Sequence, residues 1–208
     1  MPPKCKFTRE QIIEAAVNVT RKKGIKALRA RDIAEELGVS TQPVFSCFAN
    51  MEEAKTAVRL AAENLYNEYA RQGLQEKVPF FGFGRQYIRF AQEEPELYKL
   101  LFLTSSENSS GGAIAAMERS QEELRPLLMS VYHITAGEAD RYFRDMWLVG
   151  HGIATLCVTG GYPYSDAETE KILTGFSLAV CKAIKEVPGF VSGDFDRDNV
   201  FRRLVEEK

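Results

Sequence analysis

Residues Ile33–Phe48, IAEELGVSTQPVFSCF, decide how the N-terminal part of the chain folds. An apolar periodicity stops at Gly38 and begins again after Ser40. A helix that breaks sharply and restarts needs a glycine at the reversal, because a positive φ costs little only there. It also needs a small residue where the helices approach and an apolar anchor in the second helix, and Ala34 and Val44 fit these roles. The stretch therefore predicts two short helices that meet at a steep angle.

The two helices are expected over Arg31–Leu37 and Ser40–Ala49. Ser40 is predicted to cap the second through the N–H of Gln42, because Pro43 lacks an N–H and falls near the third helical position, where that loss costs little. The side chains expected to point inward are Ile33, Leu37, Val39, Val44 and Phe48. This geometry presents the N-terminal residues of the second helix to a DNA major groove.

The rest of the chain reads as helical. Thr8 and Gln11 form a capping-box pattern before a stripe of Ile12, Ala15, Ala16 and Val19 that runs to Gly24. Further helices are expected from Met51 or Glu52 into the mid-seventies, and over 83–94, 95–102, 113–133, 137–158 and 166–186. A Ser- and Gly-rich loop is expected over 104–112, and no segment has strand periodicity. The predicted class is all-α.

Composition and cysteine spacing narrow the class of protein. The 208 residues are 45% apolar and 27% charged, as in soluble globular proteins, with no apolar run long enough for a membrane span and no signal-peptide stretch. The four cysteines, Cys5, Cys47, Cys157 and Cys181, have neither zinc-site spacing nor the pattern of a disulfide framework. We expect a cytoplasmic protein without metal or cofactor, and no membrane partner.

Charge is distributed unevenly along the chain. Residues 1–50 hold nine Lys or Arg against five Asp or Glu, a net charge of +4, so the remainder carries −6 of the total of −2. A basic N-terminal part on an acidic body steers one face toward phosphates. The alternative is an ordinary solvated helix end at Arg21–Gly24, RKKG.

With these motifs in place, residues 7–66 resemble the DNA-binding domain of the TetR family of bacterial transcriptional regulators. The matching pieces are IIEAAVNVTRKKG, RDIAEELGVS, VFSCF and MEEA. Downstream, WLVGHG, which contains Trp147, His151 and Gly152, resembles a subclass with a Trp-x3-His-Gly signature. The resemblance implies a three-helix domain over 7–66, with its helix–turn–helix at about 30–49. It further implies a helical ligand-binding and dimerisation domain over 67–186, and leaves a tail over 187–208 with room for one short helix.

The resemblance implies a homodimeric regulator, a repressor in most cases, that binds a double-stranded, near-palindromic operator and responds to a small molecule. The residues expected at DNA are Arg29, Arg31, Ser40, Thr41, Gln42, Pro43, Phe45, Ser46 and Cys47. The family usually has Tyr at position 45, His at 47, Lys at 51 and Thr at 29, so several phosphate or groove contacts are absent here. Fewer phosphate contacts predict weaker and less salt-dependent binding, with PPKCK (2–6) as a possible basic arm.

Two of these residues have alternative interpretations. Phe45 can pack inside the domain with no role at DNA. Cys47 can act as a redox switch, since a thiol near arginines and a helix N-terminus has a lowered pKa, or it can be a plain small residue.

Aromatic residues crowd the region after Pro79, where FFGFG suggests short helices interrupted by glycine and an incompletely filled interior. Such an interior suits a mostly apolar effector. Candidate ligand contacts are Tyr87, Phe90, Phe102, Trp147 and His151, although Trp147 and His151 also read as a structural pair one helical turn apart.

The last two long helices are expected to form the dimer interface. In the helix over 166–186, one apolar stripe packs on its own domain and leaves another for a partner. The predicted interface residues are Gly150, Ala154, Ile172, Gly175, Phe176, Ala179 and Ala183.

No nucleophile–base–acid spacing appears around the two histidines, His133 and His151, so an enzyme is not expected. The competing hypothesis is an all-α small-molecule binding protein, or minor enzyme, whose helix–turn–helix has lost DNA binding.

Overall fold

The computed structural model describes residues 7–104 and 112–206, and throughout these ranges the chain is helical and contains no strand. The predicted all-α class is therefore confirmed. Most of the loop expected over 104–112, and the segment PPKCK, lie outside the described residues. The chain divides into two compact units, one formed by residues up to Ala116 together with Ala154–Pro163, and the other by Met117–Ile153 and Tyr164 onward.

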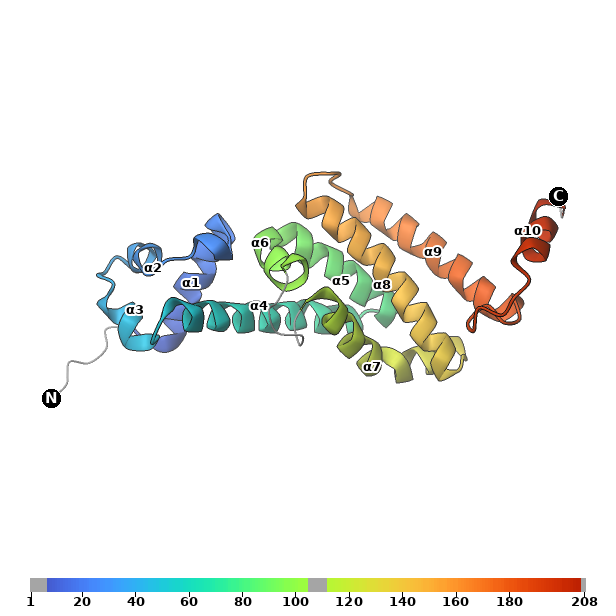
Figure 1. Cartoon of the computed structure of the whole chain (residues 1–208), viewed down its shortest axis with the longest axis horizontal. Coiled ribbons are helices and arrows are strands. Elements are labelled where there is room, and N and C mark those ends of the chain that lie inside the picture. The colour runs from blue at the N-terminus through green and yellow to red at the C-terminus, as the bar shows by residue number, and fades with distance from the viewer. Residues whose placement is uncertain (1–6, 105–111, 207–208) are drawn as a thin grey trace. The chain divides into compact units, whose positions relative to one another are not determined.

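Within the described residues, helices α1 to α6 belong to the first unit, with α4 as its longest helix (Figure 1). They are α1 (Arg9–Lys23), α2 (Ala30–Leu37), α3 (Gln42–Cys47), α4 (Met51–Leu74), α5 (Pro79–Glu93) and α6 (Pro95–Tyr98), with a 3-10 turn at Ile25–Ala27 and a π-helical turn at Lys99–Leu103. The helices of the second unit are α7 (Ala113–Tyr132), α8 (Ala136–Val158), α9 (Asp166–Glu186) and α10 (Arg197–Glu206), although the first residues of α7 and the last of α8 belong to the first unit.

Helix α1 begins and ends as its sequence predicts. The Thr8 hydroxyl accepts a hydrogen bond from the N–H of Gln11, whose side chain accepts one from the N–H of Thr8. The predicted stripe of Ile12, Ala15, Ala16 and Val19 is buried. The helix ends at Gly24, where φ is +76°.

The turn between α2 and α3 confirms the interpretation of Gly38. This residue adopts the left-handed conformation (φ 66°, ψ 37°), and the N–H of Val39 reaches back to the Ala34 carbonyl at 2.9 Å. Ala34, Val44 and Phe48 are at most 3% exposed, so the inner faces of the two helices pack as expected.

The predicted cap at Ser40 is wrong. Helix α3 begins only at Gln42, and the residue before it, Thr41, has nearly helical angles and makes no capping bond through its side chain. Pro43 thus occupies the second helical position. Ser40, the residue expected to cap the helix, lies instead in the turn between Gly38 and Gln42.

Helix α5 is continuous through the glycines that suggested interruption. It runs from Pro79 to Glu93, so the expectation of short, glycine-broken helices in this region is wrong. A Cβ atom built on Gly73 of α4 would lie 2.5 Å from the carbonyl carbon and oxygen of Gly82 of α5. Glycine at both positions therefore allows the two helix backbones to touch, a contact between distant segments that the local pattern does not reveal.

Aromatic rings fill the space between α4, α5 and the π-helical turn at Lys99–Leu103. The ring of Tyr66 lies 5.9 Å from that of Tyr87, 5.5 Å from Phe90 and 5.2 Å from Phe102, in edge-to-face arrangements. Such contacts add specific attraction to the burial of large apolar surfaces. They join α4 to the helices that follow it.

The second unit is joined by polar contacts between neighbouring helices. Arg125 of α7 pairs with Asp140 of α8 at 2.6 Å. The buried Tyr142 hydroxyl of α8 lies 2.7 Å from the Ser177 hydroxyl of α9 and donates to Tyr132 of α7. Helices α8 and α9 thus lie side by side (Figure 1).

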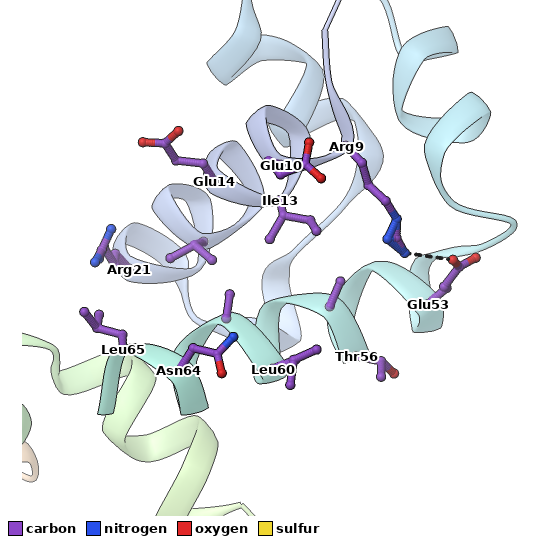
Figure 2. A pocket seen from close by; sticks show the side chains of 13 residues that line it. Arg9, Glu10, Ile13, Glu14, Arg21, Glu53, Thr56, Leu60, Asn64 and Leu65 are labelled. Carbon is purple, nitrogen blue, oxygen red and sulfur yellow. Dashed lines mark hydrogen bonds and ion pairs between the residues drawn. The ribbon is translucent and has the colours of Figure 1, made fainter. Parts of the chain in front are cut away.

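A groove of about 540 Å³ runs between α1 and α4 (Figure 2). Ile13, Val17, Leu60 and Leu65 supply much of its apolar lining, and an ion pair between Arg9 and Glu53 borders it. None of the described helices is long and apolar enough to cross a membrane.

Candidate nucleic-acid interface

Helix α3 presents one face to solvent and buries the other. Thr41, Gln42 and Ser46 are exposed, whereas Val44 and Phe48 are buried. The Ser46 hydroxyl donates to the backbone carbonyl of Gln42 at 2.9 Å and so bonds within the helix. The side-chain amide of Gln42 is the longer polar group at the start of the helix. Pro43 and Cys47 are half-buried, and Ser40 is exposed in the turn.

Phe45 shares the exposed face, because 55% of its surface is accessible to solvent. The alternative that Phe45 packs inside the domain is therefore wrong. An exposed phenylalanine ring on this face offers apolar contact where a tyrosine would offer a hydroxyl.

Four of the seven Lys and Arg residues that the structure describes within positions 7–50 have acidic partners. Lys22 pairs with Glu36 at 2.6 Å and Lys23 with Asp32 at 2.5 Å, which ties the end of α1 to α2. The hydrogen bond and charge of Lys23 lower the pKa of Asp32. The RKKG segment is thus more than a solvated helix end, because its lysines join α1 to α2 through ion pairs.

Arg21 extends this pattern with a two-pronged ion pair. Its Nε and Nη2 atoms each donate to one carboxylate oxygen of Glu94 at 2.7 Å. Hydrogen bonding to Glu94 raises the pKa of Arg21.

Arg29 and Arg31 remain available to a partner. Both are exposed at the start of α2, and neither forms an ion pair with any residue in the described ranges. Lys26, in the turn before α2, is likewise exposed and unpaired within these ranges. These three cations supply the positive charge next to the helix–turn–helix.

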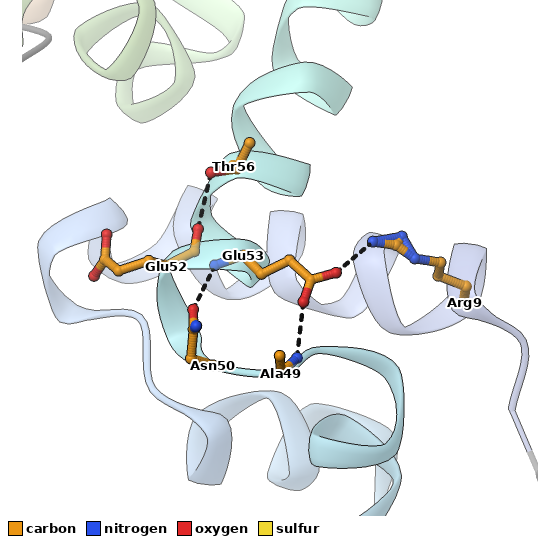
Figure 3. Close-up of polar contacts among 6 residues, drawn as sticks. All are labelled: Arg9, Ala49, Asn50, Glu52, Glu53 and Thr56. Carbon is orange, nitrogen blue, oxygen red and sulfur yellow. Dashed lines mark hydrogen bonds and ion pairs between the residues drawn. The ribbon is translucent and has the colours of Figure 1, made fainter. Parts of the chain in front are cut away.

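A polar junction centred on Glu53 fixes the chain after α3 (Figure 3). Asn50 caps α4 by accepting from the N–H of Glu53 at 2.9 Å. The carboxylate of Glu53 accepts from the N–H of Ala49 at 2.8 Å and from Arg9 at 3.2 Å. Sequence reasoning missed this junction, although Asn-x-x-Glu at 50–53 is a capping signature.

The candidate ligand contacts in the first unit are buried. Tyr87 is 3% exposed and its hydroxyl lies 3.3 Å from that of Tyr98, while burial raises the pKa of Tyr87 well above its ordinary value. Phe90 and Phe102 belong to the same aromatic packing.

In the second unit, Trp147 and His151 stack with ring centroids 4.7 Å apart and planes 8° from parallel. Burial lowers the pKa of His151, so its ring is neutral near pH 7. Among the described residues, no group of three His, Cys, Asp or Glu side chains is arranged to hold a metal ion.

The candidate dimer residues fall on different faces. Gly175, Phe176 and Ala179 of α9 are exposed, and Ile172 and Ala183 are half-buried beside them. Gly150 and Ala154 are buried, whereas the exposed face of α8 carries Leu148 and Gly152.

Two family profiles match the chain. Residues 12–53 match a profile described as bacterial regulatory proteins, tetR family, and residues 80–175 match one described as Tetracyclin repressor-like, C-terminal domain. No curated protein matches.

Solved structures share the fold at low sequence identity. A tetR-family transcriptional regulator from Streptomyces coelicolor is 17% identical, with 95% of each chain covered and a TM-score of 0.66. A TetR-like transcriptional regulator from Rhodococcus sp. RHA1 is 14% identical, covering 82% of this chain and 93% of its own, with a TM-score of 0.61. The multidrug binding protein EbrR, complexed with imidazole, is 22% identical, with coverages of 80% and 88% and a TM-score of 0.52.

Proposed function

Because the chain belongs to the tetR family of bacterial regulatory proteins, we propose that it represses transcription as a homodimer that binds a near-palindromic operator and leaves it when a small, mostly apolar effector binds. The exposed face of α3 is the observation that carries this proposal. Thr41 and Gln42 stand at its N-terminal end, while buried Val44 and Phe48 hold the helix from behind. A glutamine in this position can pair with both the N6 and N7 groups of an adenine in the major groove.

The exposed cations next to the helix–turn–helix predict that DNA affinity depends moderately on salt concentration. Lys26, Arg29 and Arg31 are the unpaired cations of the described N-terminal helices. A dimer that places all three of each protomer at phosphates neutralises six charges, which corresponds to a slope of roughly −5 in a plot of log affinity against log salt concentration.

Gel shifts at low salt with DNA from upstream of the coding region test DNA binding directly. Gln42→Ala should cost roughly 1–3 kcal/mol and relax specificity at one position of each half-site. Gln72→Ala, another exposed glutamine within a helix, is the matched control and should have no effect. Uniform weakening on every operator variant would reassign Gln42 to phosphate contact. If no upstream fragment bound, a binding protein that has lost DNA recognition would be the better description.

For the dimer, we propose the face of α9 formed by Ile172, Gly175, Phe176, Ala179 and Ala183, with Leu148 and Gly152 of α8 as its exposed neighbours. A two-fold axis through such a face closes the assembly at two copies. Gly175→Arg combined with Ala179→Glu should give a helical monomer without specific DNA binding, as sedimentation and circular dichroism would show. Persistence of the dimer would locate the interface elsewhere.

For the effector, we propose contacts with Tyr87, Phe90 and Phe102 within the first unit, or with Trp147 and His151 within the second. Trp147 is the only tryptophan of the chain, and its ring stacks on His151. Apolar compounds that bind near it should therefore change the fluorescence of the wild-type protein and release DNA over the same concentration range. Fluorescence changes without any effect on DNA would separate ligand binding from regulation.

A further inference from the structure

Helix α10 is amphipathic, and its apolar face is not covered by the described residues. None of its residues is buried, and Phe201, Leu204 and Val205 are 60%, 65% and 74% exposed. Their spacing places them on one face of the helix together with Val200. A helix of ten residues is too short to be stable in water by itself, so this face requires a covering surface.

The segment before α10 is folded and anchored. The guanidinium of Arg141 in α8 lies 4.7 Å from the ring centre of Phe190, and the Phe190 and Phe195 rings are 5.8 Å apart. A tight turn forms as the N–H groups of Gly193 and Asp194 donate to the Gly189 carbonyl at 2.9 and 3.1 Å. These contacts hold the connector against α8 and leave the apolar face of α10 open.

The second unit also has an open apolar depression. It has a volume of about 580 Å³ at the end of α7. Pro126, Met129 and Ile134 supply its apolar lining, and Ser130, His133, Thr135 and Glu138 also line it. That volume can accept two large side chains. Glu118 and Glu122 precede Pro126 at helical spacing on the same face of α7, and neither forms an ion pair with a residue of the described ranges.

We propose that α10 of each protomer packs its apolar face into the depression at the end of α7 of a second copy, so that the dimer exchanges its C-terminal helices. This inference rests on the proposed homodimer. Arg202 lies between Asp198 and Glu206 on the flank of α10, forms no ion pair with a described residue, and can pair with Glu118 and Glu122 of α7. Under two-fold symmetry the contact occurs twice, and each copy gives and receives one helix.

Sedimentation measurements of how the full-length dimer dissociates on dilution test the exchange of C-terminal helices. Phe201→Ala with Leu204→Ala should raise the dissociation constant at least tenfold, and alanine keeps the helical propensity of α10. Asn199→Ala, on the polar face of the same helix, should leave the constant unchanged. Met129→Ala should weaken the dimer as well, and the effects of Leu204→Ala and Met129→Ala should be less than additive because the two side chains meet.

Hydrogen exchange distinguishes contact between copies from a contact within one chain. Amides of α10 should be protected in the wild-type dimer and should exchange freely in the Gly175→Arg, Ala179→Glu monomer. Protection that survives in that monomer would overturn the exchange. A dissociation constant insensitive to Phe201→Ala with Leu204→Ala would overturn it while leaving the dimer intact, and a wild-type chain that is monomeric at every concentration would instead refute the homodimer itself.

Discussion

Glu53 holds the end of the helix–turn–helix against the rest of its unit, and replacing it should loosen this junction. Glu53→Ala removes the acceptor of the Ala49 N–H, the ion pair with Arg9, and a negative charge in the first turn of α4. Glu53→Gln keeps an oxygen for the Ala49 N–H and removes only the charge. Glu52→Ala removes a charge from the same turn and an ion pair with Lys55, but no hydrogen bond to the backbone outside the helix.

The expected losses follow from these differences. A capping-type bond to a backbone N–H contributes about 1 kcal/mol. An exposed ion pair and the charge at a helix N-terminus together contribute about 0.5–1.5 kcal/mol. Glu53→Ala should therefore lower the free energy of unfolding by about 2 kcal/mol, and Glu53→Gln and Glu52→Ala by about 1 kcal/mol each.

Urea unfolding of the three variants and the wild type, followed by circular dichroism, measures these differences. The gap between Glu53→Ala and Glu52→Ala isolates the bond to Ala49. Operator affinity should fall in the same order, because Ala49 directly follows Phe48, the buried residue at the end of α3. Equal losses for Glu53→Ala and Glu52→Ala would refute the role of the backbone bond.

Three further outcomes are expected. Phe45→Tyr should tighten binding to specific and non-specific DNA alike in gel shifts, because a hydroxyl on this exposed ring can reach phosphate, which carries no sequence information; a gain on the operator alone would argue for a base contact. Gly73→Ala should force α4 and α5 apart at Gly82 and cost about 1–3 kcal/mol in thermal unfolding, whereas Gly137→Ala, with open space around its Cβ, should not destabilise the protein. Burial and, second, a hydrogen bond to a carboxylate raise the pKa of Tyr69 to about 12. The protonated Tyr69 therefore contributes its full stabilisation below pH 10, and this contribution is lost as the pH rises toward 12. Tyr69→Phe should reduce the loss of stability at alkaline pH in unfolding titrations, and an unchanged pH profile would contradict this.

Features of the sequence that act locally were predictable. Gly38 could be assigned because only a left-handed residue closes the turn between α2 and α3, and Thr8 because its capping partner lies three residues away. The exposed side of α3 followed from the burial of Val44 and Phe48.

Features that depend on a distant partner were not predictable in the same way. Gly73 and Gly82 allow two helix backbones to touch, but in the sequence the glycine of α5 resembles a helix breaker. The basic residues at the end of α1 looked available for DNA until their partners, among them Glu94, were located. A single sequence gives the sign of each charge but not the residue that pairs with it. The sequence-based prediction therefore overstated the free positive charge of the N-terminal part.

The ion pair between Arg21 and Glu94 has a consequence for building chimeric regulators. Exchanging residues 7–66 for the equivalent segment of another family member would separate Arg21 from a carboxylate 73 positions away. The same cut would remove Arg59, which donates to the Leu100 carbonyl at 2.8 Å. A transplanted DNA-binding domain would therefore require residues at 94 and 100–104 that can pair with its own side chains. The segment to exchange in this protein thus extends through the π-helical turn at Lys99–Leu103.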